Sequence, residues 1–333
     1  MSDRHAGHDV LEEVRRARER TAGRLRRTPL IHSAWLSERA GTDVHLKLES
    51  LQVTSSFKAR GALNAVLALA ERTPPGEPLP TVVSASAGNH GRALAWAASS
   101  VSLPVVIFTP RNAPAAKLSA IRGHGADLRA EADDYEGAEA LAKEFARRTG
   151  ALYLSPYSHP DLLAAIGGIA LEILEDLPGV SQVVVPVGGG GLIAGVAQAL
   201  KALRPAARVV GVEVQASHPF TASLAAGRIV EVQVGPTLAD GLAGNMDPDN
   251  IAFPIVQRLV DQIVLASEAH LAAAIRGLIG REHLVAEGAG ATGVAAVLAG
   301  SVPATTPGPI TIIVSGANID TARLAAILAG PQS

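Results

Sequence analysis

A lysine near the start of this chain stands in a setting suited to chemistry. Lys58 follows Phe57 and small hydroxyl residues, between an extended apolar run at 44–48 and an apolar, helix-like segment at 63–70. An amine held at a helix N-terminus and partly shielded from water has a lowered pKa and can form a Schiff base with a carbonyl. The simpler interpretation is a solvated pair, Lys58 and Arg60, at the start of a helix, because short motifs match by chance.

Four consecutive glycines form a second candidate site. They occupy residues 188–191, between a strand expected at 183–187 and a helix expected at 192–202. Such a turn presents bare backbone N–H groups at the positive end of a helix, which makes a cradle for an anion, most often a phosphate. A turn that is needed only for tight packing is the simpler alternative.

The same segment also fits a dinucleotide-binding site. Gly189-x-Gly191-x-x-Ala194 satisfies the spacing of that fingerprint, and Glu213 ends the next strand, where a ribose-binding acid belongs. Taken alone, these residues favour a nicotinamide or flavin dehydrogenase. The remaining turns of the chain argue against that interpretation.

Two further turns follow expected strands and precede expected helices. Residues 86–91 offer backbone N–H groups and the side chains of Ser86, Asn89 and His90, a set of donors that suits a carboxylate. Residues 315–318 follow the last apolar strand, where parallel-sheet proteins place ligand contacts. The simpler interpretations are a helix N-cap beside a buried histidine at the first turn and an N-cap serine at the second.

The composition limits the classes of protein to consider. Hydrophobic residues make up 48% of the chain but aromatic residues only 3%, so we expect cores of small aliphatic side chains in helices packed on sheets. The net charge of −2 gives no general attraction for nucleic acid or an anionic membrane. The absence of cysteine excludes disulfides, thiolate metal sites and a cysteine nucleophile. Because the polar start lacks the apolar core of a signal peptide, we expect a soluble, cytoplasmic protein without a nucleic-acid or membrane partner.

Short apolar strands alternate with helices along the chain, which predicts an α/β fold of mostly parallel sheets flanked by helices. The strands are expected at 81–84, 105–108, 126–129, 183–187, 209–214, 263–265 and 310–314. Stretches with proline at 73–80 and 153–160 predict a division into two domains. The large, discontinuous domain would comprise residues 1–80 and 158–333, and the small domain residues 81–157.

Taken together, these segments resemble the fold type II pyridoxal-phosphate (PLP) enzymes, specifically the serine/threonine dehydratase and serine racemase group. The matching segments, in the family's order and across nearly the whole chain, are 27–30, 46–49, 56–62, 86–91, 188–192, 239–241, 287–289 and 315–318. The resemblance implies a two-domain architecture like that of tryptophan synthase β. In it the large domain binds PLP, and the small, mobile domain carries the loop for the substrate carboxylate.

The resemblance also implies a role for each site residue. Lys58 would carry PLP as a Schiff base and remove the substrate's Cα proton, with Phe57 beside the pyridine ring. The residues expected to bind the rest of the cofactor are Asn89 at the 3-oxygen, Gly188, Gly189, Gly190, Gly191 and Leu192 at the phosphate, and Ser315 at the ring nitrogen. Ser86, Asn89 and His90 would receive the substrate carboxylate. Because a serine cannot hold the ring nitrogen protonated as an aspartate would, loss of a β-leaving group is expected.

The expected reaction is therefore the dehydration and deamination of a small β-hydroxy amino acid, L-threonine or L-serine, to a 2-keto acid and ammonia. Alternatives on the same fold are a 3-hydroxyaspartate or phenylserine-type dehydratase, a β-replacement enzyme and a serine racemase. Racemases carry a second serine where this chain has Ala87, which has no proton to give. The alternatives from other classes are a dinucleotide-dependent oxidoreductase and an inactive binding protein, the latter expected to lack the lysine.

Two further expectations concern metal ions and assembly. Family members that bind a divalent cation use an acid at Glu213 and an aspartate a few residues later, but here Ala216 to Pro219 contain no carboxylate. No metal site is therefore expected. Members of the family usually form homodimers or homotetramers, so the resemblance implies such an assembly. The chain has no regulatory domain before Ser333, and in this it resembles the short, catabolic-type dehydratases.

Overall fold

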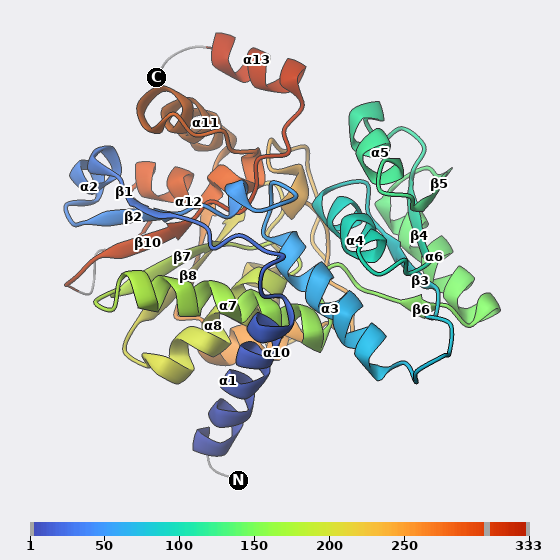
Figure 1. Cartoon of the computed structure of the whole chain (residues 1–333). Coiled ribbons are helices and arrows are strands. Elements are labelled where there is room, and N and C mark those ends of the chain that lie inside the picture. Colours follow the sequence, from blue (N-terminus) through green and yellow to red (C-terminus); the bar gives the residue numbers. More distant parts are fainter. Residues whose placement is uncertain (1–2, 303–306, 331–333) are drawn as a thin grey trace.

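The computed structural model describes residues 3–302 and 307–330, which form two sheets that lie beside one another (Figure 1). The larger sheet has the strand order β1 (Leu30–His32), β2 (Val44–Lys47), β10 (Ile310–Ile313), β7 (Gln182–Pro186), β8 (Arg208–Val214) and β9 (Gln262–Ala266). The smaller sheet has the order β5 (Asp127–Ala132), β4 (Val105–Pro110), β3 (Val82–Ala85) and β6 (Leu152–Tyr153). Among the described residues, neighbouring strands are parallel except for β1 and β2.

Helices cover both faces of each sheet. In chain order they are α1 (Asp3–Arg20), α2 (Ala34–Ala40), α3 (Lys58–Arg72), α4 (Asn89–Ser99), α5 (Ala115–Arg122), α6 (Tyr135–Thr149), α7 (Pro160–Asp176), α8 (Gly191–Leu203), α9 (Pro219–Ala226), α10 (Ala252–Leu259), α11 (Glu268–Glu282), α12 (Gly288–Leu298) and α13 (Thr321–Ala329). None of the described helices is long and apolar enough to cross a membrane.

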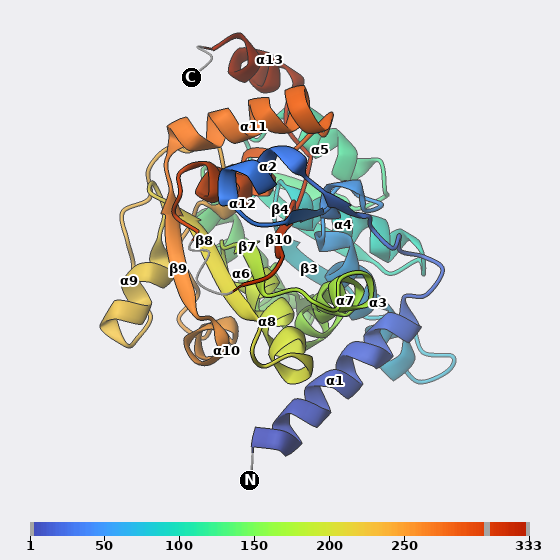
Figure 2. The same cartoon turned by 90° about the vertical axis from the view of Figure 1, so that its left-hand side faces the viewer.

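The larger sheet separates two apolar cores. Along β7, Val183 and Val185 face a core shared with α7 and α8, whereas Val184 faces a core shared with α11 and α12. This alternation follows from the two-residue period of a strand, and both faces are apolar because parallel sheets are covered on both sides. Figure 2 shows the two layers, with α2, α11 and α12 on one side of the sheet and α7, α8 and α10 on the other.

The smaller sheet is built in the same way, and α3 belongs to one of its cores. Val82 and Ile107 pack in a cluster with Leu63 and Val66 of α3 and with residues of α4, while Val83 faces α6. Because α3 also packs against α7, it lies between the two sheets (Figure 1). The reactive lysine expected from the sequence is the first residue of this central helix.

Local sequence signals explain where several helices begin and end. Asp134 caps α6 by accepting a hydrogen bond from the backbone N–H of Gly137, and Gly150 ends the helix in the left-handed conformation with φ of 75°. Pro160 occupies the first turn of α7, where its missing N–H group costs nothing. The prolines that suggested a domain boundary near residue 160 therefore also start a helix.

The predicted α/β fold of mostly parallel sheets is confirmed, and each strand expected from the sequence is present within a few residues. Several helices start earlier than expected, among them α3 at Lys58 rather than residue 63, and α4 at Asn89 rather than residue 92. The sequence interpretation did not identify α2, α7, α9 or α10. The division at residues 80 and 157 stays a prediction, since α3 precedes it but shares a core with the smaller sheet.

Candidate active site

Lys58 is held at the start of α3 with its amine directed at a backbone carbonyl. Its Nζ donates a hydrogen bond to the carbonyl oxygen of Pro156 at 2.6 Å and lies 5.1 Å from the centre of the Phe57 ring. The side chain is half-buried, and burial lowers the pKa of Lys58 to about 8, because a charged amine is disfavoured away from water. A substantial fraction of the amine is therefore neutral, and nucleophilic, near pH 8.

Arg60, two residues further along α3, is not the solvated residue of the simpler interpretation. It is buried, and its guanidinium forms paired hydrogen bonds of 2.7–2.9 Å with both Glu49 and Glu172. Lys47 donates to Glu172 and to the carbonyl oxygen of Thr28, whose hydroxyl donates to Glu49. This buried ion network fixes the first turn of α3 to β2 and α7. Thr28, Lys47, Glu49 and Arg60 lie in the segments that carry the family resemblance, which gave none of them a role.

The glycine turn before α8 has no side chains, and neighbouring residues pack closely against its backbone. Gly190 has φ of 87°, which residues with side chains rarely adopt, and a Cβ placed there would overlap the ring of Phe220. A Cβ at Gly191 would lie 2.7 Å from the carbonyl oxygen of Tyr157. Since α8 begins at Gly191, the N–H groups of its first turn have no partner within the helix and can bind an anion, although the predicted contact with a phosphate stays a prediction.

Replacing Gly190 by alanine is expected to weaken binding of PLP, the cofactor that the resemblance implies, by about tenfold or more, because the positive φ and the overlap with Phe220 would distort the turn. The dissociation constant of PLP can be measured by absorbance titration of the cofactor-free protein. Gly76→Ala is the matched control, since Gly76 has φ of 88° and a Cβ at that position would meet nothing within 4 Å. Equal affinities of the two variants would show that the turn does not hold the cofactor.

Asn89 and His90 lie in the first turn of α4. His90 is buried, and its Nε2 is 3.1 Å from the hydroxyl of Ser84, which itself donates to Leu154. Nε2 is therefore the protonated nitrogen, and Nδ1 has no hydrogen-bond partner among the described residues. Burial, together with the charge of Lys58, lowers the pKa of His90 to about 3. Because Nε2–H is engaged with Ser84 and Nδ1 carries no proton, the neutral ring offers a carboxylate neither a donor nor a positive charge, and the backbone N–H groups of this turn are the available donors.

Ser86, the first residue of this turn, uses its hydroxyl oxygen to accept a hydrogen bond from the backbone N–H of Gly88 at 3.2 Å. A Cβ at Gly91 would collide with the carbonyl oxygen of Ser86, so the chain can turn this tightly only with glycine at that position. The hydroxyl hydrogen of Ser86 is left to donate. The predicted contact with a substrate carboxylate stays a prediction.

The turn after β10 lies directly against the segment that leads to Lys58. Phe57 donates its backbone N–H to the carbonyl oxygen of Ser315 at 3.0 Å, and Ser56 forms an isolated bridge with Gly316. Ser315 is buried, and its hydroxyl makes only a long contact, 3.5 Å, with the carbonyl oxygen of Ala289. Ser315 therefore contacts the residue that precedes Lys58, and its hydroxyl group is weakly engaged.

Glu287 is a site residue to which the sequence gave no role beyond its place in a matching segment. It is buried, and its Oε1 accepts a 2.6 Å hydrogen bond from Nδ2 of Asn89. Burial raises the pKa of Glu287 to about 7, and the charge of Asp240 adds to this, whereas Asn89 and Lys117 act in the opposite direction. The residue also lines a cavity of about 260 Å³ between α5 and α13.

The raised pKa of Glu287 predicts a pH dependence of stability. Between its ordinary value of 4.5 and about 7, the folded protein keeps a proton that the unfolded chain loses, so stability falls as the pH rises through this window. The expected fall is about 3 kcal/mol. Denaturant unfolding of the cofactor-free protein at several pH values measures it. Glu287→Gln should flatten the dependence and Glu38→Gln, on the exposed face of α2, should not; an unchanged slope in Glu287→Gln would contradict the assignment.

Glu213, the acid of the dinucleotide fingerprint, is fully buried and engaged elsewhere. Its Oε1 accepts the backbone N–H of Phe220, and its Oε2 accepts the backbone N–H and hydroxyl of Thr221, at 2.6–2.8 Å. The carboxylate therefore holds the N-terminus of α9, and it has no exposed oxygen for a ribose hydroxyl. Within residues 3–302 and 307–330, no group of three or more His, Cys, Asp and Glu side chains could hold a metal ion.

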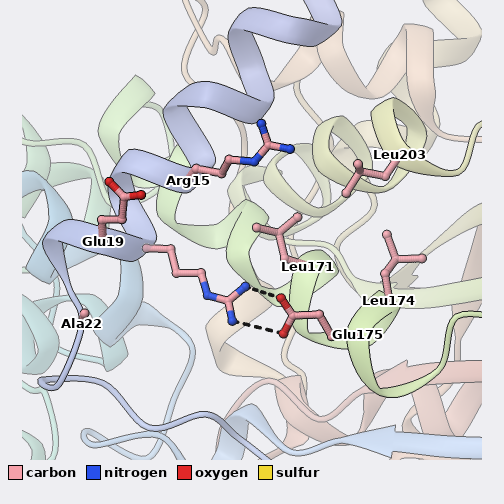
Figure 3. A pocket seen from close by; sticks show the side chains of 8 residues that line it. Arg15, Glu19, Ala22, Leu171, Leu174, Glu175 and Leu203 are labelled. Atoms are coloured by element: carbon pink, nitrogen blue, oxygen red, sulfur yellow. Dashed lines mark hydrogen bonds and ion pairs between the residues drawn. The ribbon is translucent and has the colours of Figure 1, made fainter.

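A larger cavity of about 590 Å³ lies away from Lys58, in an open groove between α1 and α7 (Figure 3). It is lined by Arg15, Arg18, Glu19, Ala22, Leu171, Leu174, Glu175 and Leu203. Arg18 and Glu175 form a paired contact across it. None of the site residues predicted from the sequence lines this groove, so its volume does not mark the active centre.

Comparison with known proteins gives a consistent result. Residues 22–316 match the family described as "Pyridoxal-phosphate dependent enzyme". The chain is 42% identical to the L-threonine ammonia-lyase of Thermotoga maritima, over 93% of this chain and 76% of that one, and 37% identical to the catabolic L-threonine dehydratase of Escherichia coli K12, over 97% and 98%. Among solved structures, maize serine racemase has a TM-score of 0.87 at 32% identity, covering 95% of each chain. The T.th. threonine deaminase has a TM-score of 0.82 at 34% identity, covering 93% of this chain and 98% of that one.

The fold is that of the fold type II PLP enzymes, as the sequence predicted, and the relatives named as an ammonia-lyase and a dehydratase support a PLP-dependent lyase. The chain belongs to the pyridoxal-phosphate dependent enzyme family. The residues present fit the cofactor: a half-buried amine with a lowered pKa, a glycine turn that side chains would fill, and a weakly engaged buried hydroxyl at Ser315. The dinucleotide oxidoreductase and the inactive binding protein are therefore set aside.

Proposed function

We propose that this enzyme dehydrates and deaminates L-threonine, and also L-serine, to the corresponding 2-keto acid and ammonia. The observation that carries the proposal is the position of the Lys58 amine. It contacts the carbonyl of Pro156, while the glycine turn packs against the adjacent Tyr157, so the amine and the anion cradle face the same short segment. The named relatives that act on threonine support this choice of substrate.

In this proposal each motif holds one part of the cofactor. The N-terminus of α8, with Gly188, Gly189, Gly190, Gly191 and Leu192, holds the phosphate. Phe57 lies beside the ring, Ser315 faces the ring nitrogen and Asn89 donates to the 3-oxygen. The half-buried lysine and the bare helix N-terminus support these assignments, because one supplies a neutral amine and the other binds an anion.

When bound, PLP supplies the electron sink that makes the Cα proton of an amino acid removable. Lys58 would take that proton, and its lowered pKa supports this role because the neutral amine can act as a base near pH 8. The first turn of α4, with Ser86, Asn89 and His90, holds the substrate carboxylate through its N–H groups. Closure of the small domain, residues 81–157, over the bound substrate would exclude water from the site.

Ala87 favours elimination over racemisation in this proposal. A racemase needs a proton donor on the face opposite the lysine, and the methyl group of Ala87 cannot supply one. The enzyme should therefore deaminate L-serine without releasing D-serine. The similarity to maize serine racemase is a similarity of fold and sequence, and Ala87 is the residue that argues for a different outcome.

The test is an assay of the purified holoenzyme with each candidate substrate. We expect 2-oxobutanoate from L-threonine and pyruvate from L-serine, each measured by coupled reduction of the keto acid. Chiral chromatography measures any D-serine that is released. A preference for 3-hydroxyaspartate or phenylserine would move the substrate assignment within the same reaction class. D-serine without pyruvate, or no keto acid from any of these amino acids, would contradict the proposal.

The proposal also includes the oligomeric state and the cellular location that the resemblance implies. We expect a homodimer or homotetramer in the cytoplasm. Light scattering coupled to size-exclusion chromatography measures the mass of the particle, and a value matching the 34.1 kDa chain alone would contradict the oligomer.

A further inference from the structure

A continuous chain of hydrogen bonds joins four side chains behind the candidate active site. Arg92 donates from Nη1 to Oδ1 of Asn318, Asn318 donates from Nδ2 to Oδ1 of Asn89, and Asn89 donates from Nδ2 to Oε1 of Glu287, each at 2.6 Å. The residues come from α4, the turn after β10 and the residue that precedes α12. They are all at least partly buried.

The chain has a single direction because of the groups at its ends. An arginine side chain can only donate, so the oxygen of Asn318 must face Arg92. The nitrogen of Asn318 then faces Asn89, and it also donates to the carbonyl oxygen of Thr54 at 2.9 Å, an atom that can only accept. Arg92, which can only donate, and the carbonyl oxygen of Thr54, which can only accept, each require the same orientation of the Asn318 amide.

The orientation of Asn318 determines that of Asn89. With its oxygen occupied by Asn318, Asn89 turns its nitrogen toward Glu287, whose Oε1 accepts in both the ionised and the neutral form of the carboxyl group. An amide nitrogen carries two hydrogens, and Glu287 takes one of them. The other remains available to a neighbour in the active site.

We propose that Arg92 is a positioning residue of this enzyme: through Asn318 it holds the Asn89 amide with its nitrogen toward the cofactor, so that Asn89 donates to the cofactor's 3-oxygen. This inference rests on the role proposed above for Asn89. A donor at the 3-oxygen stabilises its ionised form, and the absorption spectrum of bound PLP reports that ionisation directly. Arg92 itself need not touch the cofactor or the substrate.

Charge strengthens this arrangement. The first hydrogen bond has a charged donor, and the last has a charged acceptor once Glu287 is ionised, above its raised pKa of about 7, so these bonds are then stronger than those between neutral groups. Bonds in series also polarise one another in a weakly hydrated interior. Removing the arginine would leave the oxygen of Asn318 without its donor, and the carbonyl oxygen of Thr54 alone would then hold that amide in its orientation.

The experiment compares three holoenzyme variants with the wild type. Arg92→Met removes the donor, Arg92→Lys keeps a side chain that can only donate, and Asn318→Asp places an oxygen opposite the oxygen of Asn89. We expect Arg92→Met and Asn318→Asp to lower kcat by about tenfold and to shift the spectrum toward the form with a protonated 3-oxygen. Arg92→Lys should retain most of the wild-type spectrum. The matched control is Arg122→Met, which makes the same substitution at an exposed position of α5.

A wild-type spectrum and kcat in Arg92→Met would overturn the inference. A lowered melting temperature with an unchanged spectrum would also overturn it, because it would assign Arg92 a purely structural role. If Asn318→Asp does not fold, the pair Arg92→Met and Arg92→Lys decides the question. Failure of the proposed function is seen separately, as a wild-type protein that binds PLP but releases no keto acid.

Discussion

Lys58→Ala is expected to lower the rate of keto-acid release from L-threonine by at least about 10³-fold, since it removes both the cofactor's covalent partner and the base for the Cα proton. The half-buried amine with its pKa lowered to about 8 has no substitute in the described part of the site. Steady-state kinetics measures the loss. The variant should also lose the visible absorbance that a PLP–lysine bond gives.

Lys201→Ala is the control for this substitution. Lys201 lies near the end of α8, and its amine pairs with Asp261 at 2.8 Å. This variant should keep the activity and the spectrum of the wild type. A Lys58→Ala protein that releases keto acid at the native rate would show that another group carries the chemistry.

Arg60→Met is expected to destabilise the protein by about 3–5 kcal/mol, because it leaves two buried carboxylates without their shared cation. Arg60 forms ion pairs with both Glu49 and Glu172. Burial raises the pKa of Glu172, but Arg60 and Lys47 together hold it below its ordinary value. Lys47 alone cannot balance both acids. Urea unfolding gives the change in the free energy of unfolding.

The matched control is Arg16→Met on α1. Arg16 pairs with Glu12 and Glu13 where all three side chains are more than half exposed, so its loss should cost less than about 1 kcal/mol. Equal losses of stability in the two variants would contradict the importance of the buried network. The network also fixes the first turn of α3, so Arg60→Met should weaken PLP binding in the fraction that remains folded.

The motifs that could be predicted from the sequence are those in which short apolar strands run into glycine or polar turns. The turns at 188–191 and 315–318 follow β7 and β10, which are neighbours in the larger sheet, and the turn at 86–91 follows β3 of the smaller sheet. A local pattern was sufficient there, because strand, turn and helix are adjacent along the chain.

The partners of these motifs could not be predicted, because they are distant in sequence. Arg60 meets Glu172 across 112 positions, and Asn89 meets Glu287 across 198. No local pattern distinguishes a buried, paired arginine from a solvated one. The helix α7 was missed for a related reason: it is packed by α1, α3 and α8, so much of its surface is apolar and it lacks the clear polar face of an exposed helix.

The central claim is that Lys58 binds PLP, and covalent trapping tests it most directly. Borohydride reduction of the holoenzyme, followed by digestion and peptide mass spectrometry, locates the lysine that carries the cofactor. The account predicts one pyridoxyl-phosphate group per chain, on the peptide that contains Lys58. Modification of Lys47, Lys117, Lys143 or Lys201 instead, or of no lysine at all, would contradict it.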